Sequence, residues 1–289
     1  MTQLFLGLPA PAKLNLFLHV NGRRDDGYHV LQSAFQLIDL ADSLDFELRE
    51  DGEIVREGDL LGPAEDDLCV RAARQLKEFT HTPLGATIRV RKRVPAGAGM
   101  GGGSSDAATT LIALNRLWKL RMPREALAAL GLRLGADVPF FIFGSNAFAE
   151  GVGERLAPLR LPRRWFAVIW PGVHVATADI FRSPDLTRDT EPTTIAVFSA
   201  VAEETQDTAP VKLWGRNDLQ DVACRQSPEI GQALQHLEKF GNPRMTGSGA
   251  AVFVALNSAD AAKMAVSDLP PGWKGWAVRG LDSHPMSPW

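Results

Sequence analysis

Glycine gathers in one short segment of the chain, where five glycines fall between positions 97 and 103. A residue without a Cβ atom lets the backbone turn tightly and approach a ligand. Ser104, Ser105 and Asp106 follow, and these residue types are good N-caps for the helix that the next apolar residues predict. A helix that begins here directs free N–H groups and the positive end of its dipole at the loop, an arrangement that holds phosphate. The predicted phosphate-binding residues are Pro95, Ala96, Gly97, Ala98, Gly99, Met100, Gly101, Gly102, Gly103, Ser104 and Ser105.

Other glycine-rich motifs could explain the same loop. Gly97, Gly99 and Gly102 match the G-x-G-x-x-G fingerprint, so an NAD-dependent oxidoreductase is an alternative from a different class. Against it, residues 87–94 carry charge at alternate positions, and no acidic residue stands about 20 positions beyond the loop. No Gly-Lys-Ser/Thr follows the glycines, which excludes a Walker A loop. A flexible linker seldom leads into a capped, periodic helix. Phosphate binding by a different kind of loop is favoured.

A lysine, an amide and a carboxylate outside this loop could take part in phosphoryl transfer. Lys13 and Asn15 alternate with leucines in a predicted strand, residues 13–20, so their side chains lie on the face opposite the leucines. That face could be solvated, or it could place a positive charge beside a phosphate or a forming alkoxide. Asp137 precedes a very apolar run. It could be an ordinary turn residue, or a partly buried carboxylate that needs a partner such as Lys13.

Two further segments allow either a structural or a ligand-binding interpretation. Tyr28, the only tyrosine of the chain, stands beside His29 after an Asp-Gly pair, which is typical of an exposed turn but could also meet a ligand. Residues 245–253 form a second loop of small residues that leads into a strand. The backbone of such a loop can approach a ligand or simply another strand.

The elements that must position these residues divide the chain into two parts. The first part contains alternating strands and two helical patterns, at residues 107–118 and 127–134. After about residue 155, prolines separate short strands, and a helical region interrupted at Pro228 leads to a strand, a helix and a last strand. We therefore predict an α+β fold of two domains, an N-terminal α/β domain (residues 1–155) and a C-terminal α+β domain (residues 156–289).

The composition of the chain excludes some classes of function. Its 289 residues carry a net charge of −3 with a pI near 6.1, so the chain lacks the basic surface of a nucleic-acid-binding or membrane-surface protein. Two isolated cysteines offer no disulfide framework or metal motif, and no apolar run resembles a membrane span or a signal peptide. We expect a cytoplasmic protein that binds neither nucleic acid nor membrane and is a monomer or a weak homodimer.

Taken together, these segments resemble the GHMP kinase superfamily. Residues 95–108 are similar to its phosphate loop, P-x-x-x-G-L-G-G-G-S-S-D-A-A, with Met100 at the usual leucine, and residues 246–253 are similar to its C-terminal glycine motif. Four more segments resemble the branch of the superfamily whose substrate carries a cytidine diphosphate group: residues 11–16, 26–29, 135–141 and 217–219. The resemblance therefore covers most of the chain.

The resemblance implies an ATP-dependent kinase with two domains, one that binds ATP and one that completes the substrate cleft. The γ-phosphoryl group would pass to a hydroxyl, at the 2-position, of a cytidine-diphosphate-linked methylerythritol of the non-mevalonate isoprenoid route. Asp137 would accept or orient the hydroxyl proton, and Lys13 would stabilise the resulting charge. Mg²⁺ would be held largely by the nucleotide and water, and no residue is assigned to it.

The same resemblance implies how the cytidine group is bound. Tyr28 would lie against the cytosine ring, His29 would read its hydrogen-bonding edge, and Phe181 would cover the other face with Thr177 nearby. Homoserine and mevalonate kinases of the superfamily remain alternatives, as does a nucleotide sensor without turnover. The presence of both Lys13 and Asp137 argues against a sensor. The substrate-binding residues implied are Asn15, Tyr28, His29, Thr177, Phe181, Gly247 and Ser248.

Overall fold

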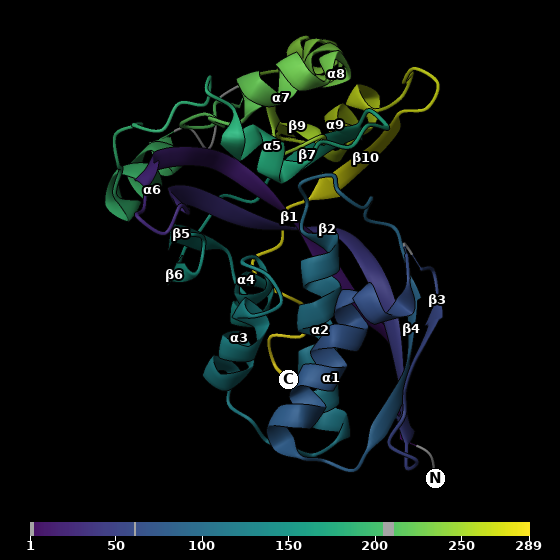
Figure 1. Ribbon diagram of the computed structural model, residues 1–289. Coiled ribbons are helices and arrows are strands. Elements are labelled where there is room, and N and C mark those ends of the chain that lie inside the picture. Colours follow the sequence, from purple (N-terminus) through teal and green to yellow (C-terminus); the bar gives the residue numbers. More distant parts are fainter. Residues whose placement is uncertain (1–2, 61, 205–210) are drawn as a thin grey trace.

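The computed structural model describes residues 3–60, 62–204 and 211–289. Two long antiparallel strands, β1 (Leu4–Arg23) and β2 (His29–Arg49), run from the lower to the upper half of the molecule in Figure 1. Each half contains a β-sheet with helices packed against it, which confirms the predicted α+β class. Within the described residues, no helix is both long and apolar enough to cross a lipid bilayer.

The lower half is built on a six-stranded sheet in the order β3-β4-β2-β5-β6, with β1 paired to β2. Helix α2 lies at the centre of the helical layer because it packs against β1 and against three other helices. Residues 107–118 and 127–134 are helical almost as predicted, whereas α1 was not predicted from the sequence. The elements are β3 (Ile54–Gly58), η1 (Ala64–Asp66), α1 (Leu68–Thr80), β4 (Gly85–Arg91), α2 (Gly102–Leu117), α3 (Arg124–Leu132), α4 (Val138–Phe143), β5 (Ala147–Gly151) and β6 (Arg155–Pro158).

The upper half is built on a four-stranded antiparallel sheet in the order β10-β7-β9-β8. The predicted helical region breaks at Pro228 as expected, because proline suits the first turn of a new helix. The predicted strand, helix and last strand are also present, as β9, α9 and β10. The elements are β7 (Trp165–Trp170), α5 (Thr177–Arg182), α6 (Ile195–Glu204), α7 (Gln220–Gln226), α8 (Pro228–Glu238), β8 (Arg244–Met245), β9 (Val252–Leu256), α9 (Ala259–Ala265) and β10 (Lys274–Arg279).

Strand β1 is buried on both faces, whereas its alternating pattern predicted a half-buried strand. Every residue between positions 12 and 20 is buried, including Lys13 and Asn15 at 3% and 2% exposure. The reason is that the strand serves both halves of the molecule. Its leading residues pack in the core beneath α2, and its last residues, Leu18 and Val20, pack with Val254 of the upper sheet. The polar side chains of β1 are therefore held inside the protein.

The two halves of the molecule exchange segments of the chain. Leu18 and Val20 belong to the core of the upper half, although they lie early in the sequence. Conversely, the segment after β10 returns to the lower half, where Met286 joins the core around α2 (Figure 1). The division into domains at residues 155 and 156 stays a prediction.

Arg244 at the start of β8 joins the upper sheet to β1. Its guanidinium is almost fully buried and donates hydrogen bonds to the carbonyl oxygens of Leu16, Trp214 and Leu213, the last two at 2.9 and 3.0 Å. Burial lowers the pKa of Arg244 to about 10, so the side chain remains charged at neutral pH. One charged side chain thus satisfies carbonyl groups of two segments that are distant in sequence.

We predict that Arg244→Ala destabilises the fold by about 2–4 kcal/mol, because one buried and two half-buried carbonyl oxygens lose a charged donor. Urea unfolding followed by far-ultraviolet circular dichroism measures the change. Arg160→Ala is the matched control, since Arg160 is exposed and its removal is expected to change the unfolding free energy by less than about 0.5 kcal/mol. Equal stability of the two variants would contradict the role given to Arg244.

Candidate active site

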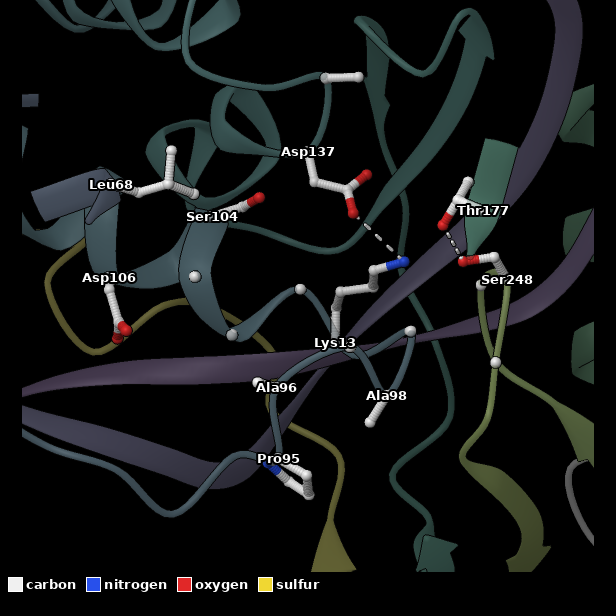
Figure 2. A pocket seen from close by; sticks show the side chains of 18 of the residues that line it. Lys13, Leu68, Pro95, Ala96, Ala98, Ser104, Asp106, Asp137, Thr177 and Ser248 are labelled. Atoms are coloured by element: carbon white, nitrogen blue, oxygen red, sulfur yellow. Dashed lines mark hydrogen bonds and ion pairs between the residues drawn. The ribbon is translucent and has the colours of Figure 1, made fainter. Parts of the chain in front are cut away.

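A cavity of about 650 Å³ is lined by residues from both halves of the molecule. In Figure 2, Lys13 and Asp137 point toward each other, with Leu68 and Asp106 on one side of them and Thr177 and Ser248 on the other. Most of the predicted site residues meet at this cavity. Those in its wall are Lys13, Asn15, Pro95, Ala96, Gly97, Ala98, Gly99, Gly101, Gly102, Gly103, Ser104, Asp137, Thr177, Phe181, Gly247 and Ser248.

Four predicted site residues do not line the cavity. Met100 is 1% exposed and packs in the core between the two sheets. Ser105 is fully buried in α2, and its hydroxyl has no hydrogen-bond partner among the described residues. Tyr28 is 65% exposed on the turn between β1 and β2, and His29 lies against Phe181. The roles predicted for these four residues stay predictions.

The phosphate loop ends at the beginning of helix α2. The prediction that Ser104, Ser105 or Asp106 caps this helix is wrong: Gly101 is the N-cap, and the three polar residues lie within the helix. Gly101 adopts a positive φ of 71°, which glycine accepts readily. Since the first helical hydrogen bond runs from Ser105 N–H to the Gly101 carbonyl oxygen, the preceding N–H groups have no acceptor within the helix. They are free to bind an anion beside the cavity.

The loop is held by backbone hydrogen bonds on both of its sides. Lys13 N–H in β1 donates to the Met100 carbonyl oxygen at 3.0 Å, and Ala251 N–H donates to the Ala98 carbonyl oxygen at 3.1 Å. Gly99 has a φ of 76°, and a Cβ atom there would lie 2.2 Å from the carbonyl oxygen of Thr246. The phosphate loop and the second glycine-rich loop are therefore in direct backbone contact, which no other residue at position 99 would permit.

Lys13 and Asp137 form an ion pair at the centre of the cavity. Lys13 Nζ lies 3.5 Å from Asp137 Oδ2, and their side chains are 4% and 33% exposed. The ammonium group also donates to Asn15 Oδ1 at 2.5 Å and lies 5.1 Å from the centre of the Phe35 ring. Asp137 precedes α4 and turns its carboxylate toward the loop (Figure 2). A cation and a proton acceptor thus stand together beside a phosphate loop, as phosphoryl transfer to a hydroxyl requires.

Asn15 fixes the position of Lys13 through a chain of buried hydrogen bonds. Its amide donates to Ser33 Oγ at 2.8 Å, and the Ser33 hydroxyl donates in turn to the Phe17 carbonyl oxygen at 2.6 Å. The backbone N–H of Asn15 donates to Thr246 Oγ1 at 2.9 Å. Because the amide is committed to these partners, its oxygen faces Lys13 and limits where the ammonium can lie.

An aromatic pair at the other end of the site is fastened by an arginine. The His29 and Phe181 rings stack with centroids 4.8 Å apart and an interplanar angle of 27°. Arg188 Nε donates to His29 Nε2 at 3.1 Å, and Arg188 Nη2 donates to the Phe181 carbonyl oxygen at 2.8 Å. Burial lowers the pKa of His29, and the charges of Arg188 and Arg23 lower it further. His29 is therefore neutral at pH 7, and because Nε2 accepts a hydrogen bond, its proton lies on Nδ1.

Sequence reasoning missed several residues of this site. Arg188 and Ser33 act through partners that are 159 and 18 positions away, so no local pattern marks them. His174 lines the cavity beside Gly97. It was not singled out from the sequence, because the histidines show no spacing typical of a metal site. Thr246 stands in the second glycine-rich loop, but its partner Asn15 is 231 positions away, so no local pattern marks their contact.

A phosphate loop at a helix N-terminus, a Lys–Asp pair and a cavity that extends to both sides of this pair define a small-molecule kinase. The family model of the GHMP kinases N terminal domain matches residues 67–145. The chain is 55% identical to the 4-diphosphocytidyl-2-C-methyl-D-erythritol kinase of Thiobacillus denitrificans, over 99% of this chain and 98% of that protein. It is 56% identical to the kinase of the same name from Aromatoleum aromaticum, over 97% and 95%. The chain belongs to this family of GHMP kinases.

Solved structures agree with the assignment. A crystal structure of 4-(cytidine 5'-diphospho)-2C-methyl-D-erythritol kinase is similar with a TM-score of 0.80 and 34% identity, covering 97% of this chain and 99% of that one. A homoserine kinase from Cytophaga hutchinsonii has a TM-score of 0.69 at 14% identity, over 98% and 95% of the two chains, and thus shares the fold. Family membership excludes the oxidoreductase and the sensor without turnover.

We predict that Gly99→Ala raises the KM for ATP at least tenfold, because the new Cβ atom would push the phosphate loop away from Thr246. Steady-state kinetics with varied ATP measure this change. Gly272→Ala is a matched control: Gly272 also has a positive φ, of 87°, but no atom lies within 4 Å of the new methyl group. Both variants bear backbone strain of about 1 kcal/mol or more. An equal KM in both would show that the contact with Thr246 does not matter.

Proposed function

We propose that this protein transfers the γ-phosphoryl group of ATP to the 2-hydroxyl of 4-diphosphocytidyl-2-C-methyl-D-erythritol, a step in the non-mevalonate synthesis of isoprenoid precursors. The names of the relatives support this substrate. The observation that carries the proposal is the position of the Lys13–Asp137 ion pair. It stands in one cavity between the phosphate loop and the Thr177–Ser248 edge. Two phosphate-bearing ligands can meet there with the reacting groups at the pair.

ATP would lie with its phosphates on the loop and on the free N–H groups at the beginning of α2. The loop N–H groups and the helix dipole both favour anions, and the two hydrogen bonds from Lys13 and Ala251 hold the loop in shape before ATP arrives. Preorganised donors lower the barrier because they need not reorient during the reaction. The adenosine would extend toward Leu68, on the side of the cavity away from Thr177 and Ser248 (Figure 2).

Mg²⁺ would neutralise the charge of the ATP phosphates. The cation prefers oxygen ligands and usually keeps several water molecules. No group of three or more acidic, histidine or cysteine side chains in the described part of the chain could hold a metal ion by itself. We propose that the nucleotide carries the cation, and that its phosphates and water supply most of the ligands.

Asp137 and Lys13 would act on the hydroxyl group of the substrate. Asp137 accepts or orients the hydroxyl proton, so that the oxygen lone pair points at the γ-phosphorus. The ammonium group of Lys13 pairs with the carboxylate of Asp137 and stabilises the negative charge that develops on the oxygens. Since phosphoryl transfer depends mainly on alignment and charge neutralisation, a carboxylate can serve here chiefly by positioning the nucleophile.

The cytidine group would be bound at the other end of the cavity. The proposed contacts are the ring of Phe181, the neutral imidazole of His29 and the paired hydroxyls of Thr177 and Ser248, whose oxygens lie 2.6 Å apart. Stacking together with hydrogen bonds to the base edge is how proteins usually recognise a pyrimidine. Tyr28 is proposed to cover the free face of the ring, and its exposed side chain is available for that contact.

The proposal is tested by ADP release with ATP, Mg²⁺ and one of three alcohols: 4-diphosphocytidyl-2-C-methyl-D-erythritol, homoserine or mevalonate. We expect ADP release that depends on the cytidyl compound alone. Release with homoserine or mevalonate instead would overturn the substrate while leaving the kinase class intact. A folded protein that releases no ADP with any of them would contradict the proposal as a whole.

We predict that Asp137→Asn lowers kcat by at least 100-fold while ATP binding stays nearly unchanged, because the amide cannot accept the hydroxyl proton. Turnover and ATP titration are measured on the same preparation. Asp282→Asn serves as a control, since Asp282 is exposed and pairs with the exposed Arg163. A kcat close to that of the unmodified protein would show that Asp137 has no part in handling the proton.

We predict that Arg188→Met raises the KM for the cytidyl substrate about tenfold and leaves the KM for ATP unchanged. Without Arg188, His29 loses the donor that fixes its orientation, and its pKa, which burial lowers most, loses the further lowering by the charge of Arg188. The pH dependence gives a second test. Protonation of His29 in acid, below its lowered pKa, abolishes its acceptor, so the KM for this substrate should rise as the pH falls.

The control for Arg188 is Arg182→Met, which removes an exposed arginine of the same segment that pairs with Asp179. Its KM values are expected to match those of the unmodified protein. If Arg188→Met instead raised both KM values equally, Arg188 would support the fold and not the pyrimidine site.

A further inference from the structure

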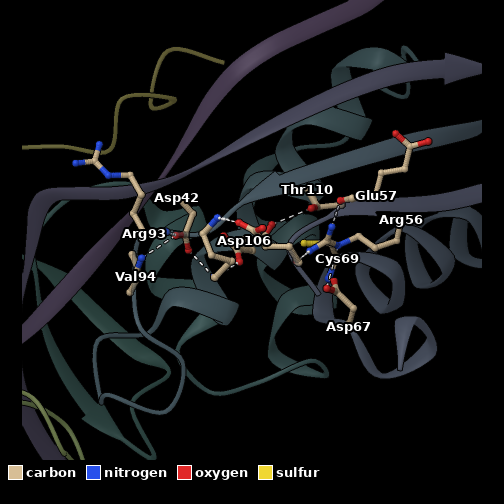
Figure 3. Close-up of polar contacts among 11 residues, drawn as sticks. Asp42, Arg56, Glu57, Asp67, Cys69, Arg93, Val94, Asp106 and Thr110 are labelled. Atoms are coloured by element: carbon tan, nitrogen blue, oxygen red, sulfur yellow. Dashed lines mark hydrogen bonds and ion pairs between the residues drawn. The ribbon is translucent and has the colours of Figure 1, made fainter. Parts of the chain in front are cut away.

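An ion triad that the proposed chemistry does not use lies beneath the phosphate loop. Lys92 Nζ is 2.5 Å from Asp42 Oδ2 and 2.6 Å from Asp106 Oδ2. Asp42 on β2 and Asp106 on α2 are 1% and 5% exposed, and Lys92 follows β4 directly. Figure 3 shows the side chains of Asp42 and Asp106, which come from different elements of the lower half, close to each other. Two buried carboxylates thus share one ammonium group.

Asp42 fixes the backbone at the point where the loop begins. Its second oxygen, Oδ1, accepts hydrogen bonds from Arg93 N–H at 2.5 Å and from Val94 N–H at 2.8 Å. These two residues immediately precede the loop. The orientation of the chain as it enters the loop is therefore set by a carboxylate whose other oxygen binds Lys92.

Asp106 holds the chain at the point where the loop has become a helix. It lies in α2, directly after the last predicted phosphate-binding residue. The two ends of the loop also touch, because a Cβ atom on Gly102 would lie only 2.9 Å from Val94 Cγ1. Lys92 thereby ties the entry, through Asp42, to the exit, through Asp106. The triad thus holds the two ends of the loop together from a place apart from Lys13 and Asp137.

The charge of this triad is not balanced when both carboxylates are ionised. Asp106 Oδ1 is buried and has no hydrogen-bond partner among the described residues. Burial raises the pKa of Asp106 to about 7, with Lys92 opposing the rise and Asp42 adding to it. Burial by itself lowers the pKa of Lys92, but the charges of Asp106 and Asp42 outweigh burial and raise this pKa, so Lys92 stays charged. Asp106 is therefore the group of the triad that changes charge near neutral pH.

One further group of α1 faces Asp106 from the other side. Burial and the charge of Asp106 raise the pKa of the Cys69 thiol well above its usual value, so this group stays uncharged. Beyond it, Arg56 Nε pairs with Asp67 Oδ2 at 3.0 Å (Figure 3). Arg56 is thus paired with Asp67 and is not the counter-charge of Asp106.

We propose that Asp42, Lys92 and Asp106 are positioning residues of the phosphate loop, and that the charge of Asp106 sets how tightly the loop binds the phosphates of ATP. This inference rests on the proposed binding of ATP. An ionised Asp106 beside the loop repels the anionic phosphates, and a proton on Asp106 removes that repulsion. ATP binding and protonation of Asp106 therefore favour each other. The affinity for ATP falls as the pH rises from 6 to 8.

The test measures binding of ATP by calorimetry at pH 6 and pH 8, without the second substrate and with Mg²⁺ in excess. For the unmodified protein, we expect the Kd to rise by about three- to tenfold between the two pH values. Asp106→Asn is neutral at every pH and can still accept from Lys92, so its Kd should match that of the unmodified protein at pH 6 and lie about three- to tenfold below it at pH 8. The titration of the nucleotide itself cancels, because both proteins bind the same ligand.

Asp106→Ala separates positioning from charge. It is also neutral but cannot accept from Lys92, so its Kd for ATP should exceed that of Asp106→Asn about fivefold at both pH values. Glu65→Gln controls for the loss of an exposed carboxylate nearby and should retain the pH dependence of the unmodified protein. The inference is overturned if Asp106→Asn keeps the full pH dependence, or if the alanine and asparagine variants bind ATP equally. Failure of the unmodified protein to bind ATP at either pH would instead overturn the proposed function.

Discussion

The phosphate loop is hydrogen-bonded to both halves of the molecule, and the rest of the site depends on this constraint. Lys13 N–H holds one side through Met100, and Ala251 N–H holds the other through Ala98. Because the loop is fixed in this way, β1 must pass beneath it and the second glycine-rich loop must lie across it at Gly99. The backbone of Lys13 supports the loop while its side chain reaches the cavity. One residue thus connects the scaffold to the chemistry.

Burying the polar groups that this arrangement requires is costly unless every group finds a partner. Lys13 has Asp137, Asn15 and the face of Phe35, and Asn15 has Ser33. The same rule governs the triad of Asp42, Lys92 and Asp106 under the loop, where one ammonium group pairs with two carboxylates. With both carboxylates ionised, the triad carries one negative charge too many, and protonation of Asp106 near neutral pH balances it. The groups that we propose to position the loop therefore also make its binding of phosphate depend on pH.

Local patterns in the sequence predicted the loop and the helices α2, α3, α7, α8 and α9, because glycine spacing and periodicity report on short stretches of chain. The Lys13–Asp137 pairing came instead from the need of a partly buried carboxylate for a partner and from the resemblance to the GHMP kinases. Local patterns failed where distant segments decide. The alternation in β1 indicated one buried face. Both faces of the strand are buried, because it packs in the cores of both halves of the molecule. Arg188 could not be assigned, since its partner His29 is 159 positions away. The domain boundary, Mg²⁺, the cytoplasmic location and the state of monomer or weak homodimer remain predictions.

The central claim is that the loop presents ATP so that its γ-phosphoryl group passes directly to the hydroxyl oriented by Asp137. Single-turnover quenching with ATP labelled in the γ-phosphate and with 4-diphosphocytidyl-2-C-methyl-D-erythritol tests this claim most directly. The account predicts that the label appears on the cytidyl compound, in equal amount to ADP, and on no protein side chain. Label on the protein, or label released as inorganic phosphate in place of the cytidyl product, would contradict it.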